Sequence, residues 1–417
     1  MRPAFNLLLC LLFAADAGGA ADWAQFRGPG GLATSSDKGL PTTWSNTENV
    51  VWKTELPGAG TSSPLFVGKH IFLTAYTGYN VPGQPPGSQE ELRRQVVCLN
   101  RADGKLLWKQ EVPSKLPEQE KIRDAHGYAS STPASDGQKV YAFFGKSGVC
   151  ALDLTGKMVW QADVGENLHG WGSAASPLLH GELVIVNASV ESESLVALHK
   201  GTGKEIWRAR GIKESWNTPL LVRTPDGKTE LVVAIMGKVL GFDPDKGEQL
   251  WSCNTEIGWY MVPSLVAEKG VIYCVGGRSG GALAVKAGGR GDVSKTHRLW
   301  VGKKGSNVSS PVIHEGHLYW AHENLGVVNC ADTATGNLLY EERLPRAGQI
   351  YASTVLADGK LYYVTRNGRT FVVAAKPTFE LLATNDLEEP GTFNACPVVS
   401  DSRLFLRSDR WLYCLGK

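Results

Sequence analysis

The chain has 417 residues, a formal net charge of +2, and an ordinary composition for a folded protein apart from 48 glycines and 13 tryptophans. Because the charges nearly balance, the sequence gives no general attraction to nucleic acid or to an anionic membrane, and we expect neither as a partner. The length alone would allow two or three domains, but the internal repeat described below favours a single repeating unit.

The first twenty residues are typical of a secretory signal peptide. Arg2 precedes an apolar run from Leu7 to Ala15, and small residues then lead to Ala20. About ten apolar residues are too few to cross a bilayer core of about 30 Å, so we favour a cleaved signal over a membrane anchor. The sequence therefore predicts an exported protein, periplasmic or extracellular, without a membrane span.

Residues 21–48 precede the repeats and carry Trp23, Phe26 and Trp44 among glycines and prolines. We expect this segment to wrap across a single unit formed by residues 49–417. The first residues of that unit, Asn49 to Lys53, are expected to form a β-strand.

Eight copies of one pattern fill the rest of the chain. Aligned on one shared position, the copies fall at Pro64, Pro133, Pro177, Pro219, Pro263, Pro311, Val355 and Pro397. After a first interval of 69 residues, the intervals lie between 42 and 48 residues. The first interval contains an insertion, Thr77 to Arg94, whose proline, glycine and charged residues predict an exposed loop. Short apolar runs between Gly and Asp turns at this period are typical of a β-propeller with one blade per repeat.

Each copy contains four β segments, of which the second copy gives a clear example. Its first segment starts at Pro133, and Val140 to Phe144, Val149 to Asp153 and a segment around Trp160 follow. The eighth copy stops after its third segment, Trp411 to Leu415. We expect the strand at residues 49–53 to complete it, which would remove exposed sheet edges. The predicted fold is all-β: an eight-bladed propeller of four-stranded antiparallel blades, closed by the N-terminal strand.

A large side chain occupies the same place in the fourth segment of most copies. The residues there are Trp108, Trp160, Trp207, Trp251, Trp300, Tyr340 and Leu382. An indole buries up to about 250 Å², and its N–H can bond to the next blade. We therefore interpret the tryptophans as a structural interlock. Cys98, Cys150, Cys330 and Cys414 also share one place in different copies, where we expect buried thiols too far apart for disulfides.

The motif Ala151-Leu152-Asp153-x-Thr155-Gly156-Lys157-x-x-Trp160 resembles the pyrroloquinoline-quinone (PQQ)-like propeller repeat. The stretch from Asp22 to Pro29 is similar to the start of secreted bacterial members of that superfamily. The superfamily includes quinoprotein dehydrogenases and non-catalytic scaffolds, among them the BamB-like propellers of outer-membrane β-barrel assembly. The dehydrogenase branch implies an adjacent cysteine pair, a Ca²⁺ ion and a catalytic Asp. This chain has no adjacent cysteines, so no catalytic residue is assigned.

In a propeller, the connection into each first strand and the loop between the second and third strands lie on one face. There we expect a ring of aromatic residues fringed by positive charge. The candidate binding residues are Tyr128, Trp171, Trp216, Trp259, Tyr260, Tyr351, Lys146, Lys238, Arg278, Arg366 and Arg407. Such a surface suits a flat anionic small ligand or an acidic peptide loop. The alternative is that the aromatic residues only pack at the channel mouth and the cations are solvated.

Two further patterns carry little weight. Gly277 to Gly281 matches Gly-x-Ser-x-Gly, but that hydrolase motif requires a strand-to-helix turn, whereas two strands are expected to flank it here. His317 and His322 stand at opposite ends of one expected strand, about 17 Å apart, which argues against a shared metal site with His314.

We therefore expect a non-enzymatic binding or scaffold protein of the cell envelope, with a protein or small-ligand partner and no assigned cofactor or metal. The alternative is a PQQ- or Ca²⁺-dependent quinoprotein oxidoreductase with diverged active-site residues. A carbohydrate-binding propeller is a third possibility, which rests on the aromatic residues alone.

Overall fold

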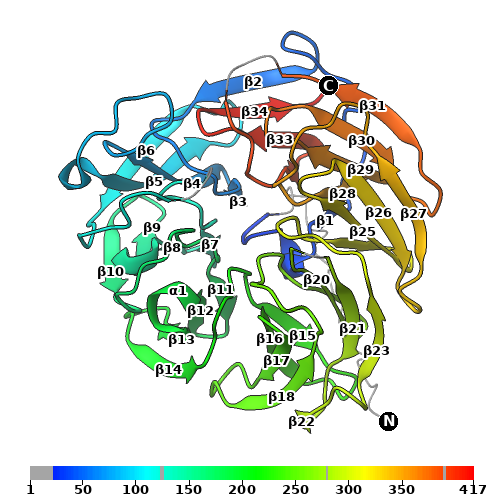
Figure 1. Ribbon diagram of the computed structural model, residues 1–417. Coiled ribbons are helices and arrows are strands. Elements are labelled where there is room, and N and C mark those ends of the chain that lie inside the picture. The colour runs from blue at the N-terminus through cyan, green and yellow to red at the C-terminus, as the bar shows by residue number, and fades with distance from the viewer. Residues whose placement is uncertain (1–21, 123–125, 279, 388–390) are drawn as a thin grey trace, which may run out of the picture.

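The computed structural model describes residues 22–122, 126–278, 280–387 and 391–417, so the predicted signal peptide lies outside the described residues. The described residues form eight β-sheets that radiate from a central axis, and the chain visits them in order (Figure 1). The predicted eight-bladed propeller is confirmed.

The first four blades have the following strands. Blade 1 contains β3 (Leu65–Val67), β4 (His70–Thr77), β5 (Arg93–Asn100) and β6 (Leu106–Val112); blade 2 contains β7 (Ala134–Ser135), β8 (Lys139–Phe143), β9 (Val149–Asp153) and β10 (Met158–Ala162); blade 3 contains β11 (Leu178–His180), β12 (Leu183–Ala188), β13 (Ser194–His199) and β14 (Glu205–Arg210); blade 4 contains β15 (Leu220–Arg223), β16 (Thr229–Ile235), β17 (Lys238–Phe242) and β18 (Gln249–Asn254), to which β22 (Gly291–Asp292) adds in parallel.

The remaining blades continue the series. Blade 5 contains β19 (Val266–Glu268), β20 (Val271–Val275), β21 (Ala282–Lys286) and β23 (Arg298–Gly302); blade 6 contains β24 (Val312–His314), β25 (His317–His322), β26 (Val327–Asp332) and β27 (Leu338–Arg343); blade 7 contains β28 (Val355–Ala357), β29 (Lys360–Val364), β30 (Thr370–Ala374) and β31 (Leu381–Asn385); blade 8 contains β32 (Val398–Ser400), β33 (Arg403–Arg407), β34 (Trp411–Leu415) and β2 (Val50–Glu55). The short elements outside the blades are η1 (Pro29–Gly31), β1 (Thr34–Ser35), η2 (Gln89–Glu91), η3 (Gly145–Ser147) and α1 (Ser189–Ser192).

The ring closes as the sequence predicts. β2, from the N-terminal end, pairs antiparallel with β34 from the C-terminal end, with Lys53 opposite Tyr413. Figure 1 shows β2 as the outermost strand of blade 8, beside the C-terminus. The two ends of the chain therefore share one sheet, and unfolding either end also opens the last blade.

A circular belt of hydrogen bonds joins the eight innermost strands. In each blade, the residue two positions before the first strand donates its backbone N–H to the side chain of the equivalent residue in the next blade. The belt residues are Ser63, Thr132, Ser176, Thr218, Ser264, Ser310, Ser353 and Cys396. Seven of the acceptors are hydroxyl oxygens at 2.8–3.1 Å, and the eighth is the Cys396 sulfur at 3.3 Å. The last bond, from Cys396 N–H to Ser63, returns to the first blade.

The belt corrects the repeat alignment in two copies. The belt residue of the fifth copy, Ser264, follows Pro263 instead of preceding a proline, so the aligned position is Leu265. In the seventh copy the aligned position is Thr354, one residue before Val355. The intervals after the fourth copy then become 46, 46, 43 and 43 residues. The repeat keeps the side chain that accepts the bond in register, whereas the proline can shift or be lost.

The predicted tryptophan interlock is present between four pairs of blades. The indole N–H groups of Trp108, Trp160, Trp207 and Trp300 donate to backbone carbonyls of Leu154, Lys200, Pro244 and Thr333 in the following blade, at 2.8–3.2 Å. The turn glycine of that following blade lies against each indole; a Cβ atom built on Gly203, for example, would lie 2.6 Å from Trp160 Cε3. The glycine of the Asp-x-Thr-Gly turn is therefore required both by its positive φ and by this close contact.

Trp251 departs from this pattern. It is fully buried in its own blade and donates its N–H to Glu230 Oε2 at 2.7 Å. Glu230, itself buried, also accepts from Gly288 N–H at 3.0 Å and from Arg290 at 3.2 Å. Gly241 in β17 leaves the space that the inward indole occupies. The prediction that Trp251 joins two blades is therefore wrong, but the side chain still packs in the protein core.

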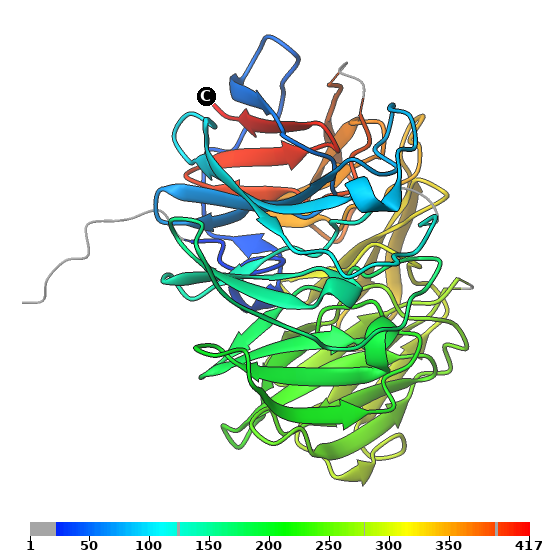
Figure 2. The ribbon, with the colours of Figure 1, turned by 90° about the vertical axis from the view of Figure 1, so that its left-hand side faces the viewer.

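The N-terminal segment lies across one face of the ring. Trp23 pairs with Phe66 in blade 1, β1 adds in parallel to β28 in blade 7, and Trp44 stacks on Tyr362 with ring centroids 6.3 Å apart. In side view this segment, in blue, lies on the opposite side of the ring from η3 and α1 (Figure 2). The segment therefore covers one end of the central channel, and the loops that contain η3 and α1 lie on the other face.

We predict that Gly247→Ala destabilises the protein much more than Gly237→Ala. Both glycines lie in blade 4 with similar φ angles of 71° and 78°, so both substitutions incur the strain of about 1–2 kcal/mol expected for a left-handed alanine. Only Gly247 abuts an indole, with Trp207 Cε3 2.4 Å from the built Cβ, whereas Gly237 faces open space. The added overlap should lower the free energy of unfolding by about a further 1–3 kcal/mol. Thermal unfolding of both variants measures the difference, and equal losses would contradict the interlock.

Candidate functional site

Two adjoining hollows lie towards the face opposite the N-terminal segment. The first is the central channel, with a cavity of about 200 Å³. The second is a side cleft of about 820 Å³ beside blade 1. Thr61 and His126 line both, so they mark the junction. Burial lowers the pKa of His126 to about 4, so its imidazole is neutral at physiological pH.

Aromatic residues from the interblade connections surround the channel mouth. Trp171, Trp216, Tyr260 and Tyr351 line the cavity. Trp216 packs edge-on to Tyr260 with centroids 5.7 Å apart, and its N–H is fixed by the Gly172 carbonyl at 2.8 Å. These four of the predicted site residues are therefore brought together by the fold.

The rim above the mouth carries the predicted positive charge in two cation–aromatic pairs. The Arg278 guanidinium lies 5.8 Å from the Trp259 ring, and Arg366 lies 4.6 Å from the Tyr351 ring. Trp259 is 39 % exposed, which is unusual for an indole. Lys238 is also exposed, at the start of β17, and the preceding Gly237 donates its N–H to the Ile257 carbonyl of the same connection.

Three predicted site residues lie elsewhere. Arg407 is 1 % exposed and donates to the backbone carbonyls of Ser62 and Thr74, so it joins blade 8 to blade 1 and adds no exposed charge to the face. The error arose because a residue at the end of a second strand was assumed to point to solvent. Lys146 donates to the Pro117 carbonyl at 2.8 Å. Tyr128 belongs to the side cleft.

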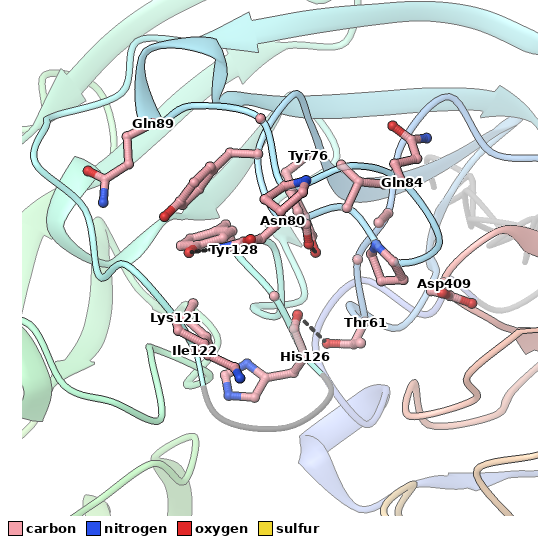
Figure 3. Close-up of a pocket in the computed structure, with 18 of the residues that line it drawn as sticks. Thr61, Tyr76, Asn80, Gln84, Gln89, Lys121, Ile122, His126, Tyr128 and Asp409 are labelled. Atoms are coloured by element: carbon pink, nitrogen blue, oxygen red, sulfur yellow. Dashed lines mark hydrogen bonds between the residues drawn. The ribbon is translucent and has the colours of Figure 1, made fainter.

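The side cleft was not predicted from the sequence. Its wall is built by the 77–94 insertion, where Tyr79 and Asn80 donate to the Glu120 carbonyl at 2.8 Å each. Tyr128 donates to Gln119 O at 2.7 Å, and burial raises its pKa to about 12. Figure 3 shows Asn80 and Tyr128 on one side of the cleft and Thr61 and His126 below them. The start of the insertion thus packs against the connection that precedes blade 2, while residues 82–88 are exposed, as expected for this loop.

The walls do not fit a Ca²⁺–quinone centre of the dehydrogenase type. Calcium takes carboxylate and carbonyl oxygens as ligands, but no Asp or Glu is among the described residues that line the channel. Across the described parts of the chain, no three His, Cys, Asp or Glu side chains are grouped to hold a metal ion. All seven described cysteines are free and buried. The strands β20 and β21 pair as a hairpin around the Gly-x-Ser-x-Gly stretch, whose Ser279 lies outside the described residues.

A buried carboxyl group supports the connection that carries Trp171. Glu191, 2 % exposed, accepts a hydrogen bond from the Ser173 hydroxyl, and its Oε2 has no partner among the described residues. Gly145 packs against Oε1, and Glu118, paired with Arg94, faces the same group. Burial raises the pKa of Glu191 to about 7, with a smaller contribution from the charge of Glu118.

Comparisons with known proteins place the repeat in a family. The family model described as outer membrane protein assembly factor BamB matches residues 89–218 and 189–378, which together span well over half of the chain. A search of curated protein sequences found no match. Among the described residues, no helix has the length and apolar character needed to cross a membrane.

Solved structures show the same fold at low sequence identity. BamB from Moraxella catarrhalis has a TM-score of 0.63 at 15 % identity, covering 88 % of this chain and 97 % of that one. The quinohemoprotein alcohol dehydrogenase from Comamonas testosteroni has a TM-score of 0.68 at 12 % identity, covering 95 % and 81 %. A europium-containing methanol dehydrogenase has a TM-score of 0.67 at 12 % identity, covering 93 % and 89 %. These likenesses establish the architecture without choosing between an assembly factor and an enzyme.

We predict that Glu191→Gln stabilises the protein at high pH. A carboxyl whose pKa is raised by folding stabilises the folded state at low pH, and that contribution is lost as the pH rises through about 7. At pH 8 the variant should exceed the wild type by up to about 3 kcal/mol, and the difference should vanish near pH 4.5. Chemical unfolding between pH 4.5 and 8 tests this, with the exposed Glu193→Gln as the control. A difference that does not change with pH would contradict the assignment.

Proposed function

The chain belongs to the family described as outer membrane protein assembly factor BamB, and on that premise we propose that it is a non-enzymatic binding or scaffold module of the cell envelope. The observation that carries the proposal is the mouth-side rim, where exposed Trp259 and the two arginine–aromatic pairs form a surface suited to a partner. The export expected from the N-terminal sequence is consistent with an envelope location.

The chemistry of the rim favours an anionic partner segment. Arg278 and Arg366 present guanidinium groups beside aromatic rings, and such groups bind carboxylates through charge-assisted, often bidentate, hydrogen bonds. Exposed tryptophan and arginine are the residue types that dominate protein–protein interfaces. We therefore expect an acidic loop or peptide of an envelope protein to bind across the mouth.

The alternative is quinone-dependent oxidoreduction. It is supported by the fold shared with dehydrogenases and by the planar aromatic groups at the mouth. The described channel walls lack the carboxylates that a Ca²⁺ ion would need, and the chain lacks adjacent cysteines. The scaffold function is therefore the better supported of the two.

We predict that a photo-crosslinking residue in place of Lys238 forms a discrete adduct with an envelope protein in intact cells. Trp259→Ala or Arg278→Glu should reduce the adduct severalfold, because each removes one half of the exposed pair. Arg223→Glu makes the same charge change at an exposed residue on the opposite face and should leave the adduct unchanged. An adduct that survives Arg278→Glu, or that falls equally with Arg223→Glu, would refute docking at the rim.

We also predict that Ca²⁺ does not change the response of tryptophan fluorescence to PQQ, measured against a bulk-quenching control. The reason is the absence of carboxylate ligands among the described lining residues. Saturable micromolar binding that requires Ca²⁺ would reverse the assignment towards an oxidoreductase.

A further inference from the structure

The belt residues leave a ring of hydrogen-bond donors around the channel. Each belt hydroxyl accepts a backbone N–H from the preceding blade, which uses one of its lone pairs. Among the described residues, none of these seven hydroxyls donates to a protein acceptor. By contrast, the neighbouring hydroxyls of Ser62 and Ser309 donate to backbone carbonyls of Thr74 and Ile350. A hydroxyl carries one donor and two acceptor sites, so the belt hydrogens remain available.

These donors face a cavity. Six of the seven hydroxyl-bearing belt residues, together with Cys396, line the channel cavity of about 200 Å³. Above them are the mouth aromatics, and Phe26 from the N-terminal segment lines the same cavity. A buried hydroxyl without an acceptor is unfavourable by about 1–3 kcal/mol, so the cavity is suited to a ligand that supplies acceptors.

The electrostatics favour an anion over a cation. The described lining residues include no Asp or Glu, and His126 is neutral. Arg27, next to Phe26 in the chain, is 2 % exposed, and no carboxylate among the described residues pairs with it. Its Nε and Nη2 donate to the carbonyls of Gly31 and Pro311, while Nη1 has no partner in the described chain. Burial lowers its pKa to about 10, which leaves it charged at neutral pH.

We propose that the channel binds a small carboxylate anion, with the carboxylate accepting from the belt hydroxyls and the apolar body against Trp216 and Tyr260. Arg27 does not line this cavity, but it bonds to the carbonyl of Pro311, which follows the belt residue Ser310, and from there its charge favours the negative head group. This site lies inside the channel and does not depend on docking at the rim, so loss of the Lys238 adduct would leave it unaffected.

Cys396 allows a test in both directions. A thiol is a weak donor, and Cys396 shows that it can still accept the belt hydrogen bond, at 3.3 Å from Ser353 N. Cys396→Ser therefore adds an eighth strong donor, and Ser310→Cys removes one, while both retain an acceptor for the belt. Ser309→Cys makes the same change one residue away, at a side chain outside the cavity lining.

The experiment is calorimetric titration of the mature protein with benzoate, and with benzyl alcohol as the neutral analogue. We expect saturable benzoate binding that is at least tenfold tighter than that of benzyl alcohol. Cys396→Ser should tighten benzoate binding about threefold to tenfold, and Ser310→Cys should weaken it by a similar factor, as expected for one hydrogen bond. Ser309→Cys should match the wild type.

Several results would overturn the proposal. Equal affinity for benzoate and benzyl alcohol would show an apolar cavity without anion recognition, and absence of saturable benzoate binding would exclude the site. Unchanged benzoate affinity in both Cys396→Ser and Ser310→Cys would show that the belt hydroxyls do not contact the ligand. Thermal unfolding of each variant confirms that it is folded, and if Ser310→Cys fails this check, Cys396→Ser alone decides the question.

Discussion

The structure depends on the belt of hydrogen bonds between successive innermost strands. A blade buries its faces only against its neighbours, so the ring is stable only when every interface is made and the last blade meets the first. The belt supplies one directional contact at each interface, and the bond from Cys396 N–H to Ser63 completes it between blades 8 and 1. Each bond contributes about 1 kcal/mol. Its larger effect is to set the height and rotation of each blade relative to the next.

This geometry also determines the properties of the channel. Because the belt lies at the innermost strands, six of its seven hydroxyl-bearing residues line the channel cavity and give that wall polar groups without charge. On the outer edge a different contact acts, in which Trp160 and its equivalents reach the turn glycine of the next blade. At four interfaces the inner polar contact and the outer indole contact therefore act at two radii, and apolar clusters fill the space between them.

The architecture could be predicted from the sequence because the same spacing and turn residues recur in every copy. The alignment error at Pro263 arose because proline was treated as the fixed feature when the belt hydroxyl is the constrained one. The error at Val355 arose because the seventh copy has no proline there, and its belt residue, Ser353, marks the position instead. Arg407 and Trp251 illustrate a second limit. Both occupy positions that repeat elsewhere, but Arg407 turns inward to backbone carbonyls and Trp251 turns towards Glu230. Which way one side chain turns depends on its local partners, and a repeat pattern does not encode those.

The candidate site could be predicted only in part for a related reason. The mouth aromatics lie in the connections between blades, and their place on one face follows from propeller topology alone. The side cleft is formed by two segments far apart in the repeat pattern, the 77–94 insertion and the connection before blade 2, joined through the Glu120 carbonyl. Other copies also tie this loop to the next connection, as Gly237 N–H does to the Ile257 carbonyl, but the long insertion belongs to the first copy. The repeated part of the sequence identifies the fold. The connections between blades and the 77–94 insertion do not repeat, and they form the candidate site that distinguishes this protein.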